Sequence, residues 1–195
     1  MSTVAPTRSR LLHAAREVVE EGGYGAASVA AVAERAGVAT GTMYRHFASK
    51  EELFVEVFRA VCTREEHAML AVDRSMPATA SAAERLQAVL ATFAQRALRN
   101  PRLAWALIAE PVDPRVDAER LAYRERYAAV IARGLTAGIE AGELPAQSVE
   151  LTAAALVGGC GEALVGPLSP LATGGPPAEE IVGALRAFVG RAVGA

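Results

Sequence analysis

One short stretch of the sequence gathers side chains that are well suited to contacting nucleic acid. Between positions 40 and 50 lie hydroxyl, imidazole, guanidinium and ammonium groups, all of which can donate hydrogen bonds to phosphate oxygens. The arginine among them could also bond the edge of a guanine in the major groove, and a glycine lets a backbone approach closely. The candidate DNA-binding residues are Thr40, Gly41, Thr42, Tyr44, Arg45, His46 and Lys50, together with Ser28 at the start of the preceding helix.

Two short helices joined by a tight turn would position these side chains. Apolar spacing predicts a helix over residues 29–36 that ends at Gly37, followed by a second helix over residues 39–47. Gly37 can adopt positive φ at low cost, while Val38 and Met43 are expected to be buried beneath the turn. This pattern predicts a helix-turn-helix whose second helix would lie in the major groove of double-stranded DNA.

The remainder of the chain shows only helical spacing, so the fold is predicted to be all-α with about nine helices. A three-helix head would occupy residues 1–50, and a larger helical body would occupy residues 51–195. Ser49 and Glu52 have the spacing of a capping box at the start of the fourth helix. The other helices are predicted over residues 7 to about 22, 50–73, 81–98, 101–110, 113–141, 148–164 and 178–193.

The first third of the chain closely resembles the DNA-binding head of the TetR family of regulators. The resemblance covers about residues 8–58 and rests on the run VAERAGVATGTMYRHFASKEELF. It implies that the body binds a small-molecule effector and forms a homodimer. It also implies DNA contacts by the residues that match the family pattern, namely Thr40, Gly41, Thr42, Tyr44, His46 and Lys50.

Charge is distributed in the direction that this interpretation requires, although the whole chain has a formal charge of −2. Residues 1–50 carry six basic and four acidic side chains, whereas the rest of the chain carries 14 basic and 18 acidic ones. Lys50 is the single lysine of the sequence, and the other 19 basic residues are arginines. The basic surplus therefore lies on the segment that would face phosphates.

Several classes of function are disfavoured by the residues. Cys62 and Cys160 lie far apart, so a disulfide scaffold or a zinc site is not expected. Cys62 could in principle sense oxidants, but its burial as an inert thiol is favoured, and the sequence does not decide whether either cysteine has a redox role. No paired catalytic groups, nucleotide-binding loop or metal cluster is recognisable in the sequence. We therefore expect that the protein is not an enzyme and binds no cofactor. The most apolar stretch, residues 151–171, is interrupted by glycines, Glu162 and Pro167. With no signal-peptide pattern either, we expect a cytoplasmic protein that does not enter the membrane.

Aromatic and large apolar side chains of the body could line a pocket for an effector whose identity the sequence does not give. Core packing is the alternative for each of them. Arg96 and Glu110 could add polar contacts, although surface exposure is the favoured expectation for both. The candidate ligand-binding residues are Met69, Phe93, Trp105, Tyr123 and Tyr127.

The last two predicted helices are candidates for a dimer interface. Small residues recur between Ala153 and Gly161, and they would allow close packing of helices from two subunits. Packing within one subunit is the alternative. Taken with these patterns, the resemblance to the TetR family implies a ligand-responsive repressor that binds a palindromic operator as a homodimer. A transcriptional activator or an architectural DNA-binding protein without an effector remains the alternative function.

Overall fold

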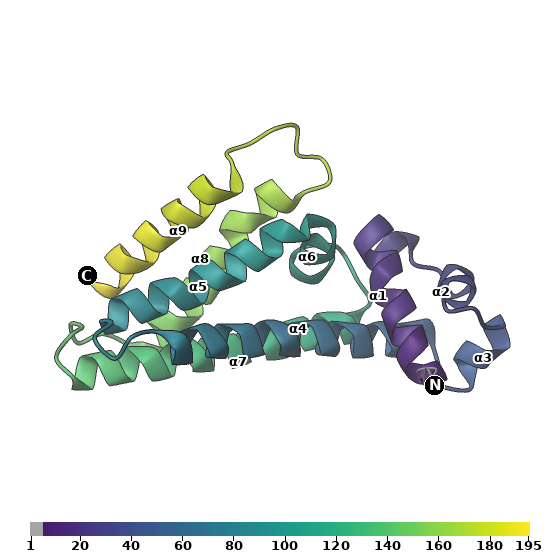
Figure 1. Ribbon diagram of the computed structural model, residues 1–195, viewed down its shortest axis with the longest axis horizontal. Coiled ribbons are helices and arrows are strands. Elements are labelled where there is room, and N and C mark those ends of the chain that lie inside the picture. Colours follow the sequence, from purple (N-terminus) through teal and green to yellow (C-terminus); the bar gives the residue numbers. More distant parts are fainter. Residues whose placement is uncertain (1–5) are drawn as a thin grey trace.

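The computed structural model describes residues 6–195, and this part of the chain forms nine α-helices without a strand (Figure 1). A small head at one end joins an elongated helical body. This confirms the all-α prediction. The helices are α1 (Thr7–Ala26), α2 (Val29–Arg35), α3 (Thr40–Tyr44), α4 (Lys50–Ser75), α5 (Ala82–Arg99), α6 (Pro101–Ile108), α7 (Pro114–Glu140), α8 (Val149–Leu168) and α9 (Ala178–Val193).

The head is a three-helix unit closed around apolar side chains from all of its elements. Leu11, Met43 and Phe47 are almost completely buried there, and the side chain of Ser28 caps α2 by accepting a hydrogen bond of 3.1 Å from the Ala31 amide. Gly37 has a φ of 65°, so the predicted glycine turn is confirmed.

Two details of the head differ from the expectation. Val38 is only half-buried, because it packs at the edge of the core rather than beneath the turn. The helix α3 ends at Tyr44, whereas a helix to Phe47 was predicted; a turn at Arg45 and His46 replaces its last residues. The side chain of Phe47 is still drawn into the core by the turn.

The first helix continues beyond the glycine pair at which it was expected to end. It runs to Ala26, but Gly23 has a φ of 80° and a ψ of 179°, which interrupts the helix. Such an interruption removes intrahelical partners from the neighbouring backbone groups, and these groups then need partners from elsewhere. The α6 helix supplies them, as described below.

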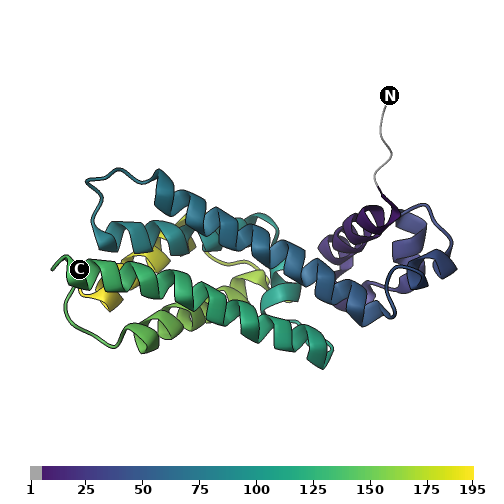
Figure 2. The ribbon, with the colours of Figure 1, turned by 90° about the horizontal axis from the view of Figure 1, so that it is seen from below.

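The body is built along α4 and α7, which run side by side over its length (Figures 1 and 2). The α4 helix also reaches into the head, where Leu53 and Phe54 are buried. It begins as expected, since the Ser49 side chain accepts a hydrogen bond of 3.2 Å from the Glu52 amide. Because α4 contributes to both the head and the body, the predicted domain boundary at residue 50 stays a prediction.

Candidate DNA-binding surface and effector cavity

The exposed face of α3 carries most of the predicted DNA-binding residues. Thr40, Gly41 and Tyr44 face solvent, and Tyr44 is 53% exposed. Arg45 and His46 are also exposed in the turn that follows, whereas Thr42 is half-buried. Apart from its chain neighbours and the backbone of its own helix, no atom of the described residues lies within 4 Å of the Cβ position of Gly41, so its backbone is open to a partner. The structure therefore brings these groups together on one surface, and their contacts with DNA remain a prediction.

The remaining two candidates lie at the starts of neighbouring helices. Ser28 is exposed at the start of α2. Lys50 opens α4, and its Nζ atom lies 5.0 Å from the ring centroid of Tyr24 and 5.5 Å from that of Phe54. The negative faces of aromatic rings attract an ammonium group. These two rings therefore hold the half-buried lysine side chain at the edge of the head.

A cavity of about 240 Å³ opens into the body between α4, α5, α6, α7 and α8. Phe93, Tyr123 and Tyr127 line it, as the predicted ligand site requires. Met69 and Trp105 do not belong to its lining: Met69 is 1% exposed within the core, and Trp105 is half-buried against the core. The apolar wall comprises Phe58, Val61, Cys62, Phe93, Ala97, Leu103, Ala104, Leu107, Ile108, Tyr123, Tyr127 and Val157.

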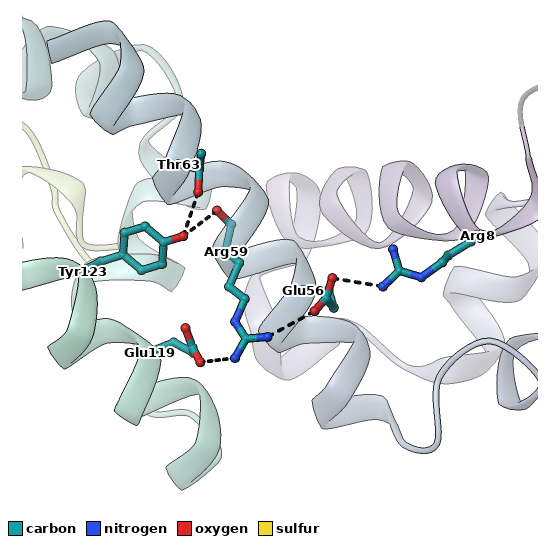
Figure 3. Close-up of polar contacts among 6 residues, drawn as sticks. All are labelled: Arg8, Glu56, Arg59, Thr63, Glu119 and Tyr123. Carbon is teal, nitrogen blue, oxygen red and sulfur yellow. Dashed lines mark hydrogen bonds and ion pairs between the residues drawn. The ribbon is translucent and has the colours of Figure 1, made fainter. Parts of the chain in front are cut away.

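Both tyrosine hydroxyls in this lining are held by α4. The Tyr123 hydroxyl donates to the Arg59 carbonyl oxygen at 3.1 Å and lies 2.7 Å from the Thr63 hydroxyl (Figure 3). The Tyr127 hydroxyl donates to the Cys62 carbonyl oxygen at 3.1 Å. Burial raises the pKa of Tyr127 far above its ordinary value, so this phenol stays neutral. The two rings are thereby fixed as walls of the cavity.

A row of ion pairs connects this wall with the head. The Arg59 guanidinium on α4 contacts Glu119 of α7 at 2.5 Å and Glu56 at 3.2 Å, and Glu56 contacts Arg8 of α1 at 3.0 Å (Figure 3). Hydrogen bonding to Arg59 lowers the pKa of Glu119, which keeps this carboxylate charged. Polar contacts therefore run from the cavity wall along α4 to the first helix of the head.

A second connection between body and head lies where α6 meets the interruption of α1. The Glu110 carboxylate accepts hydrogen bonds from the Tyr24 amide at 2.9 Å and the Gly25 amide at 3.2 Å. The Arg102 guanidinium donates to the Gly22 carbonyl oxygen at 2.6 Å. These are the backbone groups that the turn at Gly23 leaves without helical partners. Side chains of the α6 segment thus complete the broken helix.

The same segment is tied to the cavity by an arginine. Arg120 lines the cavity, and its guanidinium donates to the carbonyl oxygens of Leu107 at 2.8 Å and Glu110 at 2.9 Å. Sequence reasoning did not identify Arg120. Its spacing of three and seven residues from Tyr123 and Tyr127 places all three on one helix face, and that spacing could have indicated it.

Arg96 and Glu110, the two polar residues considered for the pocket, are half-buried and bonded to other parts of the chain. Arg96 lines the cavity and forms a two-pronged ion pair with Glu65, at 2.5 and 2.9 Å. Glu110 is half-buried, as its contacts with α1 require. The expectation of surface exposure was therefore wrong for both, because each side chain finds its partner on a helix distant in sequence.

The cysteines are buried and poorly suited to thiolate chemistry. Burial raises the pKa of Cys62 to about 12 and the pKa of Cys160 to about 11. Within residues 6–195, no group of three or more metal-ligating side chains comes together. The Cys62 thiol is therefore a neutral part of the cavity wall.

The helix α8 presents an apolar surface that residues 6–195 leave largely uncovered. Its most apolar 18-residue stretch has a mean hydropathy of 1.4, so the helix could span a membrane by length and composition alone. Only 28% of that stretch is buried within the protein. Leu151 is 69% exposed on α8, and Phe188 is 38% exposed on the neighbouring α9. Apolar surface of this kind in a helical body is typical of a binding interface.

Comparison with known proteins agrees with this architecture. The family model of bacterial regulatory proteins, tetR family, matches residues 11–57, and the tetracyclin repressor-like C-terminal domain matches residues 79–164. The HTH-type transcriptional repressor KstR of Mycobacterium tuberculosis is 37% identical over 100 residues, which are 51% of this chain and 44% of KstR. The chain thus matches less than half of the length of that relative.

Solved structures share the fold over almost the whole chain. The fatty acid degradation regulator FadR from Bacillus halodurans has a TM-score of 0.80 and 19% identity, with 97% of both chains covered. FadR from Bacillus subtilis, solved in complex with stearoyl-CoA, has a TM-score of 0.75 and 22% identity, covering 95% of this chain and 97% of that chain. With both parts of the chain matched by family models, the chain belongs to the TetR family of bacterial regulatory proteins.

Proposed function

We propose that the chain is a transcriptional repressor that binds operator DNA as a homodimer and is released by a small molecule. The observation that carries this proposal is the position of α6. Leu103, Ala104 and Leu107 of this helix line the cavity, and Glu110 just beyond it holds the broken end of α1 in the head. A ligand that moves α6 would therefore also move the helix on which the DNA-binding surface is built.

The DNA-binding half of the proposal is supported by α3. In helix-turn-helix dimers, the two recognition helices enter successive major grooves about 34–36 Å apart. The exposed side chains of Thr40, Tyr44 and Arg45 would then reach bases or phosphates. A ligand that favours a body conformation with a different spacing would reduce the affinity of the dimer for its palindromic operator.

The uncovered face of α8 supports the proposed dimer. Two copies of α8 and α9 would form a four-helix interface, and Leu151 and Phe188 would then leave solvent. Burying this face against a second subunit also accounts for its apolar composition without a membrane, as expected for a cytoplasmic regulator. The small residues of α8, such as Gly158 with open space around its Cβ position, permit close approach.

Fluorescence anisotropy with labelled DNA from the region upstream of the chain's own coding sequence tests this function. Unrelated DNA of the same length serves as the control, and both titrations are repeated over a salt series. We expect tight binding to the upstream DNA with two subunits per site, and weaker, strongly salt-dependent binding to the control. Equal and weak binding to both DNAs would contradict self-regulation and favour an architectural role.

A further inference from the structure

The lining of the cavity is strongly basic. Its lining contains six arginines and one carboxylate, Glu65. Three of the arginines have acidic partners, because Arg16 pairs with Glu20, Arg96 with Glu65 and Arg120 with Asp117. The positive charge of the lining therefore exceeds what the neighbouring carboxylates neutralise.

The other three arginines, Arg64, Arg99 and Arg124, form no ion pair or hydrogen bond with any side chain or backbone group in the described part of the chain. They belong to three different helices, and each is exposed while also lining the cavity. They therefore lie at the opening, above walls formed by the buried Tyr123 and Tyr127.

At least one charge of this rim, formed by Arg64, Arg99 and Arg124, also acts on another arginine of the lining. Burial lowers the pKa of Arg120, and the positive charge of Arg124 acts in the same direction. Arg124 therefore lies close enough to Arg120 to repel it, so an anion bound beside Arg124 would gain attraction and offset this repulsion. A neutral apolar molecule would fill the interior but would leave the charges of the rim without partners.

From this arrangement we propose that the effector is an organic anion, with an apolar body in the cavity and an anionic group bound by Arg64, Arg99 and Arg124. This inference rests on the proposed function, since it names the ligand class of the same cavity. Guanidinium groups suit carboxylate and phosphate oxygens, which they can bind with two parallel hydrogen bonds. The anionic group can therefore be a free carboxylate or the phosphates of a thioester conjugate.

The size of the cavity limits the apolar body. A cavity of roughly 150 Å³ accommodates benzene, so the volume of about 240 Å³ suits one ring with a short chain or an acyl chain of moderate length. Octanoate is a suitable probe, and octan-1-ol is its neutral match with the same chain length. Octanoyl-CoA tests whether phosphates supply the anionic group.

Isothermal titration calorimetry of the full chain with these three probes tests the charge preference. We expect octanoate to bind about 10-fold more tightly than octan-1-ol at low salt, and the difference to shrink as salt screens the rim. Tighter binding of octanoyl-CoA than of octanoate would assign the site to phosphates, and the reverse order would assign it to a carboxylate. Equal affinity for octanoate and octan-1-ol, or no binding of either anion at millimolar concentration, would overturn the proposal.

A pair of double variants locates the effect. Arg64→Gln with Arg124→Gln removes two rim charges from α4 and α7, whereas Arg74→Gln with Arg133→Gln removes two exposed charges from the same helices outside this cavity. We expect the rim variant to bind octanoate roughly 3- to 20-fold more weakly, as two exposed ion pairs permit, with unchanged affinity for octan-1-ol. An equal loss in both variants would refute binding at the rim.

The proposed function is tested separately by adding octanoate and octanoyl-CoA to the protein–operator complex. Rim-dependent binding without any release of operator would contradict the small-molecule-released repressor but leave the anion site established. Release by octan-1-ol as effective as release by the anions would support the repressor and overturn the anion preference.

Discussion

Replacing Glu110 with alanine should weaken the attachment of the head to the body. The carboxylate accepts two hydrogen bonds, from the Tyr24 amide at 2.9 Å and the Gly25 amide at 3.2 Å. Helical carbonyl oxygens cannot replace it, because the backbone is non-helical at Gly23. Solvent would satisfy the two amides in the variant, but without ordering the end of α1 against α6.

The size of the effect follows from the kind of bond that is lost. A hydrogen bond to a charged group contributes about 1.5–3 kcal/mol when it is buried. Glu110 and Tyr24 are half-buried and Gly25 is exposed, so partial solvation reduces this contribution. We therefore expect a loss of about 2 kcal/mol, which corresponds to a fall of roughly 4–8 °C in the unfolding temperature for a chain of this length.

Thermal unfolding followed by circular dichroism measures this loss, and hydrogen exchange at the Tyr24 and Gly25 amides locates it. Glu140→Ala is the matched control, since Glu140 is exposed at the end of α7. It should change the unfolding temperature little. Unchanged exchange at both amides in the Glu110→Ala variant would refute the view that this carboxylate holds the broken helix.

Four further predictions concern other parts of the chain. Lys50→Ala should weaken binding to operator and unrelated DNA alike and reduce the slope of the salt dependence by about 1 in an anisotropy titration. Gly23→Ala should destabilise the fold by about 1–3 kcal/mol in a denaturant titration, because φ is 80° and the new Cβ would lie 2.8 Å from the Arg102 guanidinium. Burial raises the pKa of the Cys62 thiol to about 12, so this thiol should resist iodoacetamide at pH 8 in the folded protein and react after unfolding. The contribution of the buried thiol to the free energy of unfolding is complete below pH 9 and declines as the pH rises toward 12. Leu151→Arg should make the proposed dimer monomeric in light scattering, because it places a charge in the proposed interface, and a dimer that survives the charge would argue against α8 as the interface.

The helix-turn-helix could be predicted from the sequence because its determinants are local. Ser28 caps α2 three residues from its partner amide, and Gly37 adopts the positive φ that the turn needs. Met43 is spaced to face the core, where it is completely buried. Each of these features depends on residues only a few positions apart, so the spacing of residue types is sufficient to indicate it.

The cavity and its connections could be predicted only in part, because they depend on packing between distant segments. Tyr123 and Tyr127 line the cavity together with Phe93, and their aromatic character had indicated them. Trp105 has the same character but packs half-buried against the core and does not line the cavity. Glu110 and its partner amides are separated by 85 and 86 residues. No local pattern could have paired them.

The free energy needed to release DNA can be compared with the energy of the contacts that join the α6 segment to α1. Lowering operator affinity 100-fold requires a coupling of about 2.7 kcal/mol, which lies within the usual allosteric range. The two hydrogen bonds of Glu110 and the bond from Arg102 to the Gly22 carbonyl oxygen are together of this order. An effector would therefore not need to unfold any part of the head. It would suffice that the ligand-bound position of α6 prevents Glu110 and Arg102 from bonding the broken end of α1. DNA binding would then favour the state in which these contacts are made, and ligand binding would favour the state in which they are lost.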